Sequence, residues 1–184
     1  MAEAVGMIEV SSIAMGYQLQ DAMLKAADVQ LIVARTICSG KYIVVVSGDV
    51  AAVNSSVNHG IEAAREGLID HIIIPNVHSS VFPAITGSVE LKAEEVGALG
   101  IIETFSAASA IEAADAAVKA GNVTLFRLHL AMAIGGKGFF LVTGDVAACE
   151  AAVAAGASIA AEHGLLVNQI VIPGPRRELF KEYI

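Results

Sequence analysis

The sequence predicts an α+β protein made of two tandem ferredoxin-like domains, each with the order β-α-β-β-α-β. Two observations lead to this prediction: the chain is an internal repeat, and within each repeat the hydrophobic period alternates between strand and helix. We place the first domain at 1–91 and the second at 92–184. The join falls in the polar, charged stretch SVELKAEEV at 88–96, which suits a linker.

The repeat covers nearly the whole chain. Three pairs of segments match: 4–35 with 98–129, 40–53 with 136–149, and 67–75 with 164–173. The second half carries a two-residue insertion before its Gly-Lys pair. A repeat of this length means that one structural unit occurs twice.

The first repeat contains four predicted strands and two predicted helices. In order they are a strand at 5–10, a helix at about 12–27, strands at 29–37 and 42–48, a helix at 50–67 and a strand at 71–75. Asp49 and its counterpart Asp145 are natural N-caps for the second helix of each repeat. The β-α-β-β-α-β order is the split βαβ arrangement of ferredoxin-like domains.

The composition predicts burial between subunits. Hydrophobic residues make up 55% and charged residues 16%, with a mean hydropathy of +0.67. No run reaches the roughly 18 apolar residues of a membrane span, so we expect no membrane segment. The helix expected at 106–120 is rich in alanine and offers little core volume. Both features indicate an oligomer that completes its burial by assembly.

Net charge and cysteine content indicate which classes of binding partner and which cellular compartment are expected. The net charge is −8, the pI is near 5.0 and no Lys/Arg stripe is present, which argues against nucleic acid. The start lacks a basic n-region, so we expect no signal peptide. Two cysteines then fit a reducing cytoplasm.

Motifs for catalysis are absent from the sequence. It contains no HExxH, CxxC or GxSxG pattern. AIGGKG at 133–138 departs from a phosphate-binding loop and is better explained as a glycine-rich turn. The five histidines are scattered, and Glu94-Glu95 is explained as solvated linker charge. The sequence therefore predicts no enzyme.

Several segments resemble the bacterial microcompartment (BMC) shell domain. They are EAADAAVKAGNV at 112–123, the GDVAAV opening of the second helix and the VIP strand end. That family forms hexamers that tile into protein shells around metabolic enzymes. Because both halves match, the resemblance implies a homotrimeric pseudohexamer that assembles with other microcompartment shell proteins in the cytoplasm.

A closer resemblance is to the T-type shell proteins of propanediol-utilisation microcompartments. It extends through 21–41, 74–85 and 121–138. In that subfamily the cysteine before the Gly-Lys turn lies at the central pore, where three copies hold a 4Fe-4S cluster. Here that residue is Cys38, followed by Ser39 where the family often has Pro. The resemblance also implies which residues form the pore loops, namely Ser39, Gly40, Ile134, Gly135 and Gly136.

A threefold arrangement of Cys38 suits the chemistry of such a cluster. A 4Fe-4S cubane has a threefold axis, so three thiolates can ligate three irons and leave the fourth to water or a small molecule. The second repeat has Met132 at the aligned place, so three of six loops would carry a thiol. Against this stands the ordinary role of cysteine as a small buried apolar residue. We expect that ordinary role for Cys149, opposite Val53.

The resemblance also assigns Lys25 and Lys119 to the edge at which shell hexamers tile. The alternative is two helix-surface lysines. For function, it implies electron transfer across the shell, or supply of clusters to redox enzymes inside. Two alternatives stay open: a structural tile whose pore passes metabolites without metal, and a soluble ligand-binding regulator.

Overall fold

The computed structural model describes residues 3–92 and 94–184 and divides into two compact units. The first unit is the chain up to Val77 together with Met132–Gly135, and the second is His78–Ala131 with Gly136–Ile184. The repeat join expected at 91/92 stays a prediction, whereas the contacts divide the two units after Val77. The reason is that residues 78–91 make their contacts within the second unit, where helix α3 (Val81–Thr86) packs on strand β6 (Thr124–Leu130).

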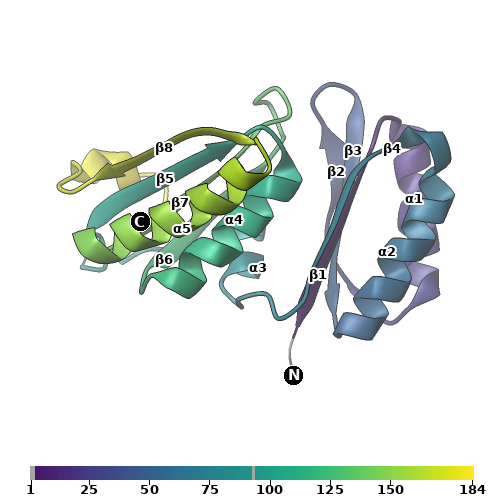
Figure 1. The fold of residues 1–184 in the computed structure, drawn as a ribbon, viewed down its shortest axis with the longest axis horizontal. Helices are drawn as coiled ribbons and strands as arrows, with labels where there is room; N and C mark the ends of the chain where they lie inside the picture. The colour runs from purple at the N-terminus through teal and green to yellow at the C-terminus, as the bar shows by residue number, and fades with distance from the viewer. Residues whose placement is uncertain (1–2, 93) are drawn as a thin grey trace. The chain divides into compact units, whose positions relative to one another are not determined.

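The first unit confirms the predicted β-α-β-β-α-β order (Figure 1). Its elements are β1 (Ala4–Val10), α1 (Ile13–Ala26), β2 (Gln30–Ile37), β3 (Lys41–Gly48), α2 (Val50–Ala64), the 3-10 turn η1 (Arg65–Gly67) and β4 (Leu68–Ile74). The strands form an antiparallel sheet in the order β2-β3-β1-β4. This is the ferredoxin-like topology, with the first and third strands at the centre.

The second unit repeats this order and adds elements at both ends. After α3 come β5 (Ala98–Thr104), α4 (Ala107–Ala120), β6, β7 (Gly138–Gly144), α5 (Val146–Glu162), β8 (Leu166–Ile172) and the 3-10 turn η2 (Arg177–Phe180). Its antiparallel sheet has the order β6-β7-β5-β8. Neither α3 nor η2 has a counterpart in the first unit.

The helices begin where the sequence indicates. The Asp49 carboxylate accepts a hydrogen bond from the Ala52 amide at 2.8 Å and so caps α2. Ser12 and Ser106 cap α1 and α4 in the same way. Asp145 occupies the N-cap position of α5, but its side chain makes no capping hydrogen bond. The predicted cap is therefore confirmed in position at both sites and in bonding only at Asp49.

In each unit two helices cover one face of the sheet (Figure 1). In the first unit one core cluster lies between the helices and the sheet, and its buried side chains include Ile8, Leu19, Met23, Tyr42, Val44 and Val57. The Ser56 hydroxyl donates to the Met23 carbonyl at 3.0 Å, joining α2 to α1. A small domain of this size depends on such burial for its stability.

The second unit also covers part of the opposite face of its sheet. Phe180 is fully buried there and packs with Leu91, Leu99 and Phe126. The Leu91 amide donates to the Tyr183 carbonyl at 2.8 Å, which ties the connecting segment to the C-terminal segment. The stretch expected to be a solvated linker at 88–96 therefore contributes an anchored side chain. Residue 93 of that stretch lies outside the described residues.

Among the described residues, no helix has both the length and the apolar character needed to cross a bilayer.

Candidate functional site

Cys38 lies in the tight turn between β2 and β3. Its side chain is half-buried, whereas Ser39 and Gly40 are exposed. Gly40 has a φ of +76°, a conformation that other residues rarely adopt, and a Cβ built there would meet nothing within 4 Å. The turn therefore presents the thiol close to an open surface rather than inside a core.

An amide from another part of the first unit reaches this thiol. The Ala133 N–H donates to Cys38 Sγ at 3.2 Å. Ala133 belongs to the segment Met132–Gly135, which makes its contacts with the first unit although it lies between β6 and β7 in the sequence. This hydrogen bond fixes the position of the sulfur atom, and cysteine binds iron through that atom.

The turn between β6 and β7 contains the other residues that the sequence assigned to pore loops. Ile134 and Gly136 are half-buried and Gly135 is exposed, with both glycines at positive φ. The Ala131 amide donates to the Lys137 carbonyl at 3.0 Å and closes the turn. Their role in a pore stays a prediction.

An ion pair stands at the base of each turn, and our sequence reasoning missed both. Lys41, the first residue of β3, pairs with Glu9 at 2.8 Å, and the Glu9 side chain is only 5% exposed. Lys137 pairs with Glu103 at the matching place in the second unit. A carboxylate this buried needs a partner. The recurrence of Glu and Lys at aligned positions was the signal that could have revealed the pairs.

Each chain offers one thiol at the Cys38 turn. Within 3–92 and 94–184, no three His, Cys, Asp or Glu side chains gather in a way that could hold a metal ion. Cysteine sulfur is the usual ligand of iron–sulfur clusters. The residue type at this turn thus fits such a cluster chemically, and a cluster here would need further ligands from outside these described residues.

Cys149 is a core residue, as the sequence predicted. It is fully buried on α5, and its Sγ lies 3.6 Å from the Ala98 carbonyl oxygen. Burial, and secondarily the charge of Asp145, raises the pKa of the Cys149 thiol. A thiol held in its neutral form is a poor metal ligand.

The two lysines assigned to a tiling edge have different surroundings. Lys25 pairs with Asp21 at 2.6 Å, and these side chains are 75% and 63% exposed. Lys119 pairs with Asp115 at the same distance, but the Asp115 side chain is only 9% exposed. Asp115 also accepts a hydrogen bond from the His78 amide at 2.8 Å. Lys119 is therefore held by a carboxylate that is itself fixed, whereas Lys25 is held by a solvated one.

Comparison with known proteins decides the family. The BMC domain matches this chain twice, at residues 4–77 and 98–175. The chain belongs to the BMC-domain family of bacterial microcompartment shell proteins. The predicted tandem repeat of this domain is confirmed, and the join expected at 91/92 lies between the two matched segments.

Individual relatives agree with this assignment. The chain is 45% identical to the bacterial microcompartment shell protein PduT of Citrobacter freundii over 184 residues, which is all of this chain and 99% of that protein. It is 31% identical to the carboxysome assembly protein CcmO of Synechococcus elongatus, covering 97% of this chain and 67% of that one.

Solved structures show the same fold. A microcompartment protein from Desulfitobacterium hafniense DCB superimposes with a TM-score of 0.94 at 50% identity, covering 98% of this chain and 99% of that one. The fused permuted hexameric shell protein of the RMM microcompartment superimposes at 0.62 with 19% identity, covering 87% and 84%. This second likeness concerns the fold alone.

Proposed function

We propose that this shell protein assembles as a homotrimer and that three copies of Cys38 hold one 4Fe-4S cluster. The observation that carries the proposal is the position of Cys38, a half-buried thiol in an exposed turn with an amide donor on its sulfur. In the described part of one chain, no three His, Cys, Asp or Glu side chains gather that could hold a metal ion. Three symmetry-related copies can supply three thiols to one cluster, because the cubane itself has threefold symmetry.

The surface of α1 supports assembly. Ile13, Tyr17 and Leu24 are 39%, 63% and 38% exposed and follow one another at helical spacing along that helix. The aligned side chains of α4 (Ala107, Ile111 and Val118) are buried. An apolar stripe that stays exposed on one of two equivalent helices is typical of a surface that another subunit covers. A trimer of this two-domain chain would contain six BMC domains.

Each residue of the turn has a defined part in this proposal. Cys38 binds iron as a thiolate, and the Ala133 amide orients the sulfur and stabilises its negative charge. The exposed Ser39 and Gly40 leave the site open to solvent. When bound, the cluster supplies one-electron redox chemistry. In the shell this chemistry serves electron transfer to redox enzymes inside, or the supply of clusters to them.

The experiment is purification without oxygen, followed by visible absorption, EPR and iron analysis. We expect about 1.3 iron atoms per chain, which is four per trimer, together with the broad absorption of an iron–sulfur cluster. Cys38→Ser should carry no cluster iron. Cys149→Val, which places the first-repeat residue at the other cysteine, is the matched control and should keep its iron.

Two outcomes would contradict parts of the proposal. Wild-type trimers without iron, even after reconstitution with ferrous iron and sulfide, would leave a structural tile with a metabolite pore. A monomer in analytical ultracentrifugation that forms no sheets in electron microscopy would overturn the assembly itself and favour a soluble regulator.

A further inference from the structure

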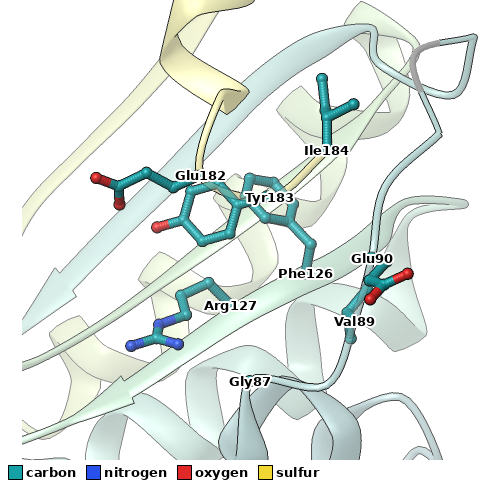
Figure 2. A pocket seen from close by; sticks show the side chains of 8 residues that line it. All are labelled: Gly87, Val89, Glu90, Phe126, Arg127, Glu182, Tyr183 and Ile184. Carbon is teal, nitrogen blue, oxygen red and sulfur yellow. The ribbon is translucent and has the colours of Figure 1, made fainter.

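A cavity of about 510 Å³ opens beside β6 in the second unit (Figure 2). Three stretches of chain form its walls: the end of α3 through Glu90, two residues of β6, and the C-terminal residues 182–184. Its volume lies within the range of about 300–1,000 Å³ typical of small-molecule sites. Two of these three stretches lie outside the strands and helices that the two units share.

A β-bulge brings two neighbouring side chains to the same cavity. Consecutive residues of a strand normally point to opposite faces. The pairing of β6 with β7 shifts register between Leu125 and Arg127, and both Phe126 and Arg127 line the cavity. Bulges commonly redirect a side chain in this way. The aligned bulge of the first unit has Val33 where the second has Arg127, so the charge belongs to the second repeat alone.

The Arg127 guanidinium is held in place without an ion pair. Its Nη2 donates to His129 Nδ1 at 3.2 Å, and it forms no salt bridge in the described part of the chain. Gly87 makes room for it, because a Cβ there would lie only 2.8 Å from Nη1. The cation is therefore positioned before any ligand arrives, and its charge is not neutralised by a carboxylate.

The opposite wall carries a carboxylate that is also unpaired with a cation. Figure 2 shows the Glu182 carboxylate and the Arg127 guanidinium on either side of the Tyr183 hydroxyl. Both acidic residues of the lining, Glu90 and Glu182, are exposed and form no ion pair in the part of the chain that the structure describes. Opposite charges thus face one cavity without touching each other.

An aromatic and aliphatic wall completes the cavity. The rings of Phe126 and Tyr183 meet edge to face with centroids 5.0 Å apart, and Phe180 supports Phe126 at 5.8 Å. Val89 and Ile184 add aliphatic surface. Packed aromatic rings of this kind offer a large apolar contact at little entropic cost.

We propose that this cavity binds a small zwitterion, an α-amino acid with an apolar side chain. Its carboxylate would pair with Arg127, its ammonium group with Glu182, and its side chain would lie against Phe126 and Tyr183. A purely anionic ligand would meet two carboxylates in the lining, and a purely cationic one would meet Arg127. Only a ligand with both charges complements both walls through charge-assisted hydrogen bonds.

Isothermal titration of the assembled full-length protein with three matched probes tests this assignment. L-leucine carries both charges, 4-methylpentanoate lacks the ammonium group, and 3-methylbutylamine lacks the carboxylate. We expect saturable binding of L-leucine and an affinity at least about tenfold lower for each of the other two, because each lacks one of the two charge-assisted hydrogen bonds. The assay does not depend on iron at Cys38.

Two variants and one control complete the experiment. Arg127→Val, the residue of the first repeat, and Glu182→Gln should each weaken L-leucine binding at least about tenfold. Arg176→Val changes an exposed arginine outside the cavity and should leave binding unchanged. Circular dichroism confirms that each variant is folded. The proposal is overturned if wild type shows no saturable binding at millimolar L-leucine, if 4-methylpentanoate binds equally well, or if folded Arg127→Val binds like wild type.

Discussion

The two repeats fill the same contact between a helix and a strand in opposite ways. In the first unit Gly16 of α1 faces Tyr42 of β3, and a Cβ on Gly16 would lie only 2.3 Å from the Tyr42 ring. In the second unit the aligned residues are Ala110 and Gly138, and a Cβ on Gly138 would lie 2.5 Å from the Ala110 methyl. In the first unit the strand provides the side chain, Tyr42, and the helix has glycine. In the second unit the helix provides the side chain, Ala110, and the strand has glycine. Equivalent positions of a duplicated fold can thus keep their backbone contact while exchanging side-chain volume.

The units differ more strongly at their margins. The second unit gains α3, the anchored connecting segment and the C-terminal segment, and it places Asp115 where the first has the solvated Asp21. The first unit instead carries the thiol turn and an exposed apolar stripe on α1. The two sheets have the same strand topology, and the units differ in the turns, helix surfaces and added segments around those sheets.

The largest expected effect comes from an anchor that only the second unit has. Phe180→Ala removes a fully buried ring from the cluster around Phe126, and we expect a loss of about 3–5 kcal/mol in unfolding free energy. Urea denaturation followed by circular dichroism measures it. The neighbouring Leu179→Ala, at a side chain 53% exposed, is the control and should stay within about 0.5 kcal/mol. A loss at Phe180 as small as at Leu179 would show that the C-terminal segment does not contribute to the core.

The aligned carboxylates give the next largest difference. Asp115→Ala leaves the His78 amide and Lys119 without their acceptor in a largely buried place, and we expect a loss of about 2 kcal/mol. Asp21→Ala breaks a solvated pair and should cost less than about 1 kcal/mol. The same denaturation assay compares them. Equal losses at the two positions would contradict the difference in burial.

The Gly16–Tyr42 contact predicts a smaller loss of stability, and it predicts that substitutions at these two positions are energetically coupled. Gly16→Ala forces a methyl against Tyr42, which costs about 1–3 kcal/mol, and a better helix former returns up to about 1 kcal/mol of that. Gly16→Ala with Tyr42→Gly reproduces the pair of the second unit. Its loss should be smaller than the sum of the two single losses by about 1 kcal/mol in a double-mutant cycle. Strict additivity would mean that the two positions do not compete for space.

The smallest effect is a dependence on alkaline pH. Burial raises the pKa of both the Cys149 thiol and the Tyr42 phenol. The folded chain therefore keeps protons that the unfolded chain loses above about pH 8.5 for the thiol and about pH 10 for the phenol. Stability is complete below those values and falls as pH rises through them, by at most about 1.4 kcal/mol per pH unit for each group.

Variants assign that slope to its two sources. Cys149→Val should flatten the thermal-stability profile between about pH 8.5 and 10, and Tyr42→Phe should flatten it only above about pH 10. Thermal unfolding followed by circular dichroism at a series of pH values measures both. A slope that neither variant changes would exclude these two groups as its cause.

Much of the fold could be predicted because most hydrophobic patterns and helix caps occur in both repeats. A strand such as β3 and a helix such as α2 are strongly periodic, and Asp49 marked the boundary between them. The helix α3 was not predicted, since its six residues are too few to show a helical period. The packing of Leu91 and Phe180 was also missed, because one or two apolar residues in a charged stretch form no periodic pattern.

Of the two candidate sites, only the Cys38 turn could be recognised from the sequence. Cys38 was noticeable because its residue type is rare in this chain and its turn is clearly marked. The Arg127 cavity was not visible in the sequence, because it depends on a bulge that breaks the alternation of β6 and on a C-terminal segment far away in the chain. The predictions of an iron–sulfur cluster and of tiling-edge lysines came from the resemblance to a known family, because the residues alone did not indicate them.

The inverted pair of Gly16–Tyr42 and Ala110–Gly138 has a further consequence during folding. A chain with two similar sequences can pair a helix of one repeat with the sheet of the other, or with a second chain. Here α4 placed on β3 would bring Ala110 against Tyr42, and α1 placed on β7 would leave an empty space between two glycines. Each helix therefore fits its own strand better than the strand of the sister repeat. This steric mismatch disfavours pairing of a helix from one repeat with the sheet of the other.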